Sequence, residues 1–110
     1  MVFAKSDIGK VRELNQDSYY ISQETEEPKL YLLADGMGGY KGGEIASKMA
    51  IDSAKKYIQN NFEGIVKEKE EILKLIKNAV EYANMVVYEK SKEEKELDGM
   101  GTTLEICLIY

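Results

Sequence analysis

The residues best suited to chemistry are an aspartate and the glycines after it, in the stretch LYLLADGMGGYKGGEIAS at positions 30–47. An apolar run ends on Asp35, Gly36 follows directly, and a helical pattern opens at Glu44. A strand that stops at a carboxylate and turns through glycines places the carboxylate at a sheet edge, where backbone can approach a bound ion or phosphate. The spacing alone leaves open that Asp35 only caps the following helix.

Two common phosphate-binding loops do not fit this stretch. A Walker A loop requires Lys and then Ser or Thr after its last glycine, but Gly43 is followed by Glu44. A dinucleotide-binding fingerprint requires a third glycine where this chain has Lys41. A carboxylate beside the glycines also repels a pyrophosphate, whereas oxygen ligands suit Mg²⁺ or Mn²⁺. The residue types therefore favour a divalent cation over a nucleotide.

The composition of this 110-residue chain, which has the length of one small domain, disfavours several classes of function. The net charge of −5 disfavours a nucleic-acid partner. No apolar run is long enough for a membrane span, and no targeting segment is visible. The single cysteine, Cys107, fits a reducing cytoplasm and is expected to be a small buried side chain. The chain has no histidine, so catalysis must rest on carboxylates, Arg, Lys, backbone groups and a metal.

The expected elements bring two carboxylates together. Strand composition at 18–22 and at 30–34 flanks a turn at 23–29 that contains the only proline. This hairpin places Asp17, at the start of its first strand, near Asp35, at the end of its second. The other expected elements are a short strand at 2–6, helices over about 43–59 and 65–94, and a last strand over 102–110.

Three segments, in this order and spacing, resemble the N-terminal part of the metal-dependent protein phosphatase (PPM) family, the type 2C serine/threonine phosphatases. They are RELNQDS at 12–18, ADGMGG at 34–39 with GEIAS at 43–47, and GTTL at 101–104. The bacterial branch of the family is the most similar. The second signature is long and specific, and the other two gain weight because they are in register with it. The resemblance spans nearly the whole chain, from about Ser6 to Leu108.

The resemblance implies an α+β fold in which residues 1–110 form the N-terminal portion of a single phosphatase domain, a four-layer α-β-β-α sandwich. It also implies two Mn²⁺ or Mg²⁺ ions at one end of the sheets. Asp35 matches the bridging carboxylate, Gly36 the residue that gives a backbone carbonyl to a metal, and Asp17 an acid of the metal shell. Arg12 matches the arginine that holds the substrate phosphate, and its planar guanidinium suits a phosphoryl group.

The activity implied by the resemblance is hydrolysis of phosphoserine and phosphothreonine in proteins by a metal-activated water. Arg12 and Asp35 are then the catalytic residues, and the expected setting is a bacterial cytoplasm with a cognate serine/threonine kinase. The alternative is a non-catalytic fragment or degenerate paralogue that binds a partner. It arises because the family's catalytic domain is much longer, and its remaining metal aspartates follow the GTT strand. For the same reason, we expect the 110-residue chain alone to be inactive.

Two residues depart from the pattern of the family. Gln16 stands where many members have Glu, and because an amide cannot match the charge of a carboxylate, Asp17 is the better candidate ligand. Met37 stands where animal members have a histidine that serves as general acid, so a metal-bound water or bulk solvent must protonate the leaving group. The segment 101–103 is expected to be a turn and the start of a strand.

Overall fold

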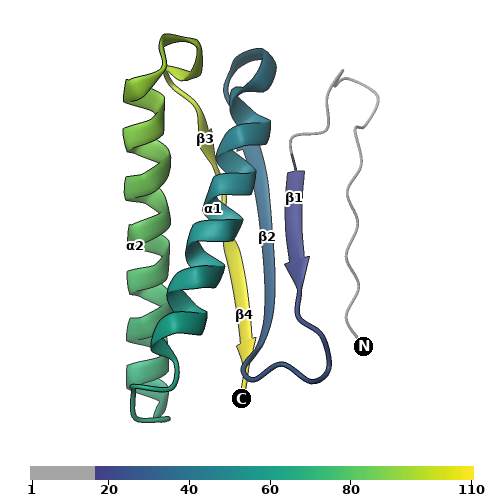
Figure 1. The fold of residues 1–110 in the computed structure, drawn as a ribbon, viewed down its shortest axis with the longest axis vertical. Helices are drawn as coiled ribbons and strands as arrows, with labels where there is room; N and C mark the ends of the chain where they lie inside the picture. The colour runs from purple at the N-terminus through teal and green to yellow at the C-terminus, as the bar shows by residue number, and fades with distance from the viewer. Residues whose placement is uncertain (1–16) are drawn as a thin grey trace.

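The computed structural model describes residues 17–110, in which two helices cover one face of an antiparallel sheet (Figure 1). In chain order the elements are β1 (Asp17–Ile21), β2 (Lys29–Met37), α1 (Gly39–Asn61), α2 (Lys69–Glu93), the 3-10 helix η1 (Lys95–Leu97), β3 (Gly101–Thr102) and β4 (Glu105–Ile109). The central strand β2 pairs with β1 along one edge and with β3 and β4 along the other. No helix in this part of the chain is long and apolar enough to cross a membrane.

The core lies between the sheet and the helices. Every second residue of β2, from Leu30 to Gly36, is buried, and the residues between them face the other side of the sheet. Helix α1 covers this face with alanines, of which Ala46 and Ala54 are fully buried, so the helix can lie close to the strands. Helix α2 packs on α1 through residues spaced three or four apart: Ile72, Leu75, Ala79, Ala83 and Val87.

Two glycines of the glycine-rich stretch allow a close contact at the start of α1. Gly38 has a φ of 127°, and a Cβ there would lie 2.5 Å from the Cα of Met100. A Cβ on Gly42 would lie 3.1 Å from the Cβ of the same Met100. These two glycines therefore serve the packing of α1 on the segment before β3.

The hairpin expected from the sequence is confirmed, but its second strand is longer than predicted. The strand was expected to end at Ala34, and it continues through Asp35 to Met37. The reason is a distant partner, because Gly36 and Met37 pair with β3. Asp35 thus lies inside a strand and three residues before Gly38, the N-cap of α1. The alternative that Asp35 caps this helix is wrong.

The helices and the last strand also differ from their predicted bounds. Helix α1 begins at Gly39 instead of position 43. Its start is extended where the first turn packs on Met100. Helix α2 begins at Lys69 instead of position 65, and in the connection between the helices the Lys67 ammonium donates to the carbonyl groups of Phe62 and Ile65. The strand expected over 102–110 is divided into β3 and β4. The short strand expected at 2–6 lies outside the described residues.

The prediction that Cys107 is buried is wrong. Cys107 lies opposite Tyr31 in the sheet, on the face that α1 does not cover, and its side chain is exposed. Residues on both sides of it in β4, Ile106 and Leu108, are half-buried against the helices. The apolar run around Cys107 therefore has one covered face and one open face in the part of the chain that is described.

Candidate metal centre

The β1–β2 hairpin sets two carboxylate residues opposite each other. In the register of this pair, Asp17 is the partner of Asp35, and Ser18 is the partner of Ala34. Directly opposed residues of an antiparallel pair project from the same face of the sheet. Because Ala34 is buried under α1, Asp35 belongs to the opposite, open face, and Asp17 occupies the register position across from it. The juxtaposition expected from the sequence is confirmed at the level of the backbone.

The residue types at this position fit a divalent cation. Like charges directly opposite each other in a sheet are destabilising, and a cation held between them removes that repulsion. Carboxylates are also the ligands that Mg²⁺ and Mn²⁺ prefer. Two carboxylates are fewer than a metal pair needs, and among the side chains that the structure describes no group of three or more His, Cys, Asp or Glu could hold an ion.

Thr103 fixes the backbone of Asp35 from the neighbouring strand. The Thr103 N–H donates to the Asp35 carbonyl at 3.0 Å, and the Asp35 N–H donates to the Thr103 Oγ1 at 3.1 Å. In a regular ladder the Asp35 N–H would be bound by the Thr103 carbonyl. That carbonyl instead accepts the hydroxyl of Thr102 at 2.7 Å. The Thr103 hydroxyl thus replaces a backbone group where β3 and β4 are separated, and it holds Asp35 in place.

The same hydrogen bond gives the direction of the Gly36 carbonyl. Successive carbonyl groups of a strand point to opposite edges. Since the Asp35 carbonyl points to Thr103, the Gly36 carbonyl points to the edge of β2 that pairs with β1. This is the edge on which Asp17 lies. The backbone thus aims the Gly36 oxygen to the side of the candidate centre.

Four site residues were predicted from the sequence, and the structure brings three of them together. Asp17, Asp35 and Gly36 lie at one end of the sheet, whereas Arg12 lies outside the described residues. The contact of Thr103 with Asp35 was not foreseen, because the GTT segment was interpreted as a turn and a strand start. A signal was present in the sequence: a hydroxyl side chain at the start of a strand can replace a ladder partner.

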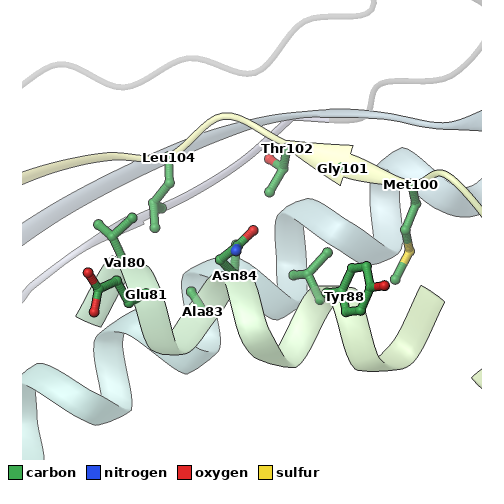
Figure 2. A pocket seen from close by; sticks show the side chains of 11 residues that line it. Val80, Glu81, Ala83, Asn84, Tyr88, Met100, Gly101, Thr102 and Leu104 are labelled. Atoms are coloured by element: carbon green, nitrogen blue, oxygen red, sulfur yellow. The ribbon is translucent and has the colours of Figure 1, made fainter. Parts of the chain in front are cut away.

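A cavity of about 400 Å³ lies on the other side of the sheet, between α2 and the segment of β3 and Leu104 (Figure 2). Figure 2 shows Leu104 and Thr102 pointing toward α2, and Asn84 and Tyr88 on the helix surface facing that segment. Most of the lining is apolar. Because Asp35 projects from the open face, this cavity is separate from the candidate metal centre.

The model of the family described as "Protein phosphatase 2C" matches residues 9–109. The chain belongs to the protein phosphatase 2C family. Among curated members of the family, the serine/threonine protein phosphatase PstP of Mycobacterium tuberculosis is 36% identical over 105 residues, which are 96% of this chain and 18% of PstP. The serine/threonine phosphatase stp of Listeria monocytogenes is 29% identical, over 96% of this chain and 41% of that protein. The chain therefore spans less than half the length of these members.

Solved structures of the protein phosphatase 2C family share this fold. The serine/threonine phosphatase Stp1 of Staphylococcus aureus matches with a TM-score of 0.79 and 31% identity, over 96% of this chain and 41% of that one. The catalytic domain of PstP, solved in complex with two manganese ions, matches with a TM-score of 0.74 and 33% identity, again over 96% and 41%. The helix layer and antiparallel sheet described above are thus part of the protein phosphatase 2C fold.

Proposed function

We propose that the protein hydrolyses phosphoserine and phosphothreonine in other proteins, with two Mn²⁺ or Mg²⁺ ions bound by Asp17, Asp35 and the Gly36 carbonyl. The observation that carries the proposal is the register of the hairpin, which sets Asp17 opposite Asp35 at one end of the sheet. The manganese ions in the solved PstP domain support Mn²⁺. Mg²⁺ is proposed because it prefers the same oxygen ligands.

The bound ions would activate the attacking water and neutralise charge on the phosphate. Asp35, whose backbone is held by Thr103, offers a fixed carboxylate on the open face. Asp17 offers a second carboxylate from β1, and the Gly36 carbonyl a neutral oxygen. Each ion takes about six oxygen ligands, so water and other parts of the full-length protein must complete the set. Arg12 is proposed to bind the phosphate of the substrate through its guanidinium fork.

The proposed partners are phosphoproteins modified by a cognate serine/threonine kinase in a bacterial cytoplasm. The names of the curated relatives support phosphoprotein substrates. The net charge of −5 disfavours nucleic acid. We also propose that residues 1–110 are the N-terminal portion of a single phosphatase domain, which agrees with the share of its relatives that the chain spans.

The test is to assay the full-length protein with a phosphothreonine peptide and Mn²⁺. We expect release of phosphate that stops when the metal is removed with EDTA and resumes when Mn²⁺ is restored. Hydrolysis that continues without metal would refute the proposed mechanism. Metal-dependent binding of the phosphopeptide without hydrolysis would favour the non-catalytic binding protein instead.

A variant of Arg12 separates phosphate binding from metal binding. Arg12→Ala removes charged hydrogen bonds to the phosphate and should raise KM roughly tenfold or more, while the Mn²⁺ dissociation constant stays near that of the parent. Arg12→Lys, which keeps the charge but loses the fork, should fall between the two. If Arg12→Ala weakens Mn²⁺ binding to the same degree as it raises KM, Arg12 supports the metal centre instead of the substrate.

A further inference from the structure

Two hydroxyl groups connect β1 to α1 next to the candidate metal centre. The Oγ of Ser47 lies 3.1 Å from the carbonyl oxygen of Glu44 and 3.0 Å from the Oγ of Ser18. A serine hydroxyl has one proton. Because the Ser47 proton goes to the Glu44 carbonyl, which can only accept, Ser18 donates the second bond. The two bonds therefore run in one direction, from the strand into the backbone of the helix.

The Ser18–Ser47 pair lies where it can affect the position of Asp17 in the candidate metal centre. Ser18 directly follows Asp17 and lies opposite Ala34, which is fully buried. Ser47 is also fully buried, as is its neighbour Ala46. At this end of β1 the helix therefore meets the sheet through small side chains, which offer little apolar surface to hold the strand. The hydroxyl pair provides a directional link at the residue next to Asp17.

We propose that the Ser18–Ser47 pair is a positioning element of the metal centre, which holds the start of β1 on α1 and so keeps Asp17 opposite Asp35. Neither serine is a catalytic residue in this proposal, because both act through Asp17. The inference rests on the proposed function, since it requires Asp17 to bind metal. It goes further in giving the last residue of the GEIAS segment, Ser47, a role in metal affinity.

Ser91 offers a matched control. It is the other serine that is buried in the described part of the chain, with 6% of its surface exposed. Its hydroxyl donates to the carbonyl of Tyr88, three residues earlier in α2, at 2.6 Å. Ser47 makes the same kind of bond to Glu44 in α1 and differs by its contact with Ser18. A comparison of the two serines therefore isolates the link to β1.

The experiment measures the Mn²⁺ dissociation constant and the Tm of the full-length protein. Ser18→Ala and Ser47→Ala should each raise the dissociation constant about fivefold, as expected for the loss of one neutral hydrogen bond. The dissociation constant of the double variant should not exceed the higher of the two single-variant values, because both changes remove the same Ser18–Ser47 hydrogen bond. Ser91→Ala should lower Tm by less than Ser47→Ala, because it removes one hydrogen bond instead of two, and should leave the dissociation constant unchanged. Ser18→Thr keeps the hydroxyl and should bind Mn²⁺ like the parent.

Equal Mn²⁺ affinity in Ser47→Ala and Ser91→Ala, or additive losses in the double variant, would overturn the inference and leave the proposed function intact. A parent protein that binds no Mn²⁺ would overturn the proposed function, and this inference with it. If the fully buried Ser47 does not tolerate alanine, the half-buried Ser18 still provides the test. Amide exchange without metal gives a second readout. Exchange in β1 should be faster in Ser18→Ala than in Ser91→Ala, and equal rates would count against the link.

Discussion

The two faces of the sheet contain similar residues in different surroundings. On the face toward α1, Leu30 and Leu32 are 0% and 2% exposed. On the other face, within the described residues, Tyr19, Leu33 and Ile109 are 48%, 39% and 50% exposed. Apolar residues on both faces are typical of a sheet between two layers. The buried residues of the covered face thus stabilise the fold of these elements. The open face combines an acidic end, at Asp17 and Asp35, with an apolar surface suited to the second sheet of the four-layer family fold.

The largest effect is expected at the acidic end of the open face. Asp35→Asn keeps the shape of the side chain but removes its charge, and should lower Mn²⁺-dependent hydrolysis of p-nitrophenyl phosphate by the full-length protein. The loss should exceed about a hundredfold, because removal of a residue that only supports a ligand already costs up to this much. Asp52→Asn, at an exposed position of α1, is the control. Unchanged activity in Asp35→Asn would exclude Asp35 as a metal ligand.

Neighbouring leucines of β2 compare the two faces directly. Leu32→Ala creates a cavity under the helices and should cost about 3 kcal/mol of unfolding free energy. Leu33→Ala removes a side chain that is 39% exposed and should cost about 1 kcal/mol. Urea unfolding of both variants, made in residues 1–110 alone, measures the difference, because in the full-length protein the second sheet of the family fold would cover Leu33. Equal losses would mean that the open face is covered in solution, and a rise in molecular mass would then identify self-association as the cover.

A variant of Thr103 tests how far metal binding at the acidic end depends on the edge of β2 that pairs with β3 and β4. Thr103→Val keeps the branched shape but leaves the Asp35 N–H without its hydroxyl acceptor. We expect Mn²⁺ to bind about tenfold more weakly, as for other supporting partners of a ligand. Thr103→Ser retains the hydroxyl and should bind as the parent does. If Val and Ser behave alike, the hydroxyl has no part in positioning Asp35.

The smallest effect is expected on the stability at alkaline pH, through Tyr20 on the covered face. Partial burial, together with the Glu26 carboxylate to which Tyr20 donates at 2.6 Å, raises the pKa of Tyr20 above its ordinary value of 10.0. The unfolded chain ionises first, so this stability is complete below pH 10 and is lost as pH rises through the folded pKa. Tyr20→Phe should cost about 1 kcal/mol or less at neutral pH and should flatten the alkaline loss of stability. Tyr19→Phe, on the open face, controls for one tyrosine fewer, and equal pH profiles in the two variants would refute the assignment.

Features that depend on residues close in sequence could be predicted, whereas features that depend on distant residues could not. The hairpin and the pairing of Asp17 with Asp35 were predictable because a short turn fixes the register of its strands. The extension of β2 beyond Asp35 was not, because its partner strand β3 is distant in sequence and lies directly before Thr103, which is 68 positions after Asp35. The exposure of Cys107 was not predictable either, since apolar residues on both faces of a strand do not indicate which face is covered. The roles of Arg12 and the metal ligands stay predictions.

The distance in sequence between Asp35 and Thr103 also bears on when the centre can form. Hairpin β1–β2 and α1 leave the ribosome first, with the second edge of β2 still lacking β3 and β4. The Asp35 backbone obtains its two hydrogen bonds with Thr103 only after α2 has been made and the loop over both helices has closed. Until then the edge of β2 is open to other strands. Binding of metal at the proposed centre would therefore be a late event in synthesis, and it would report that the two distant halves of the sheet have joined.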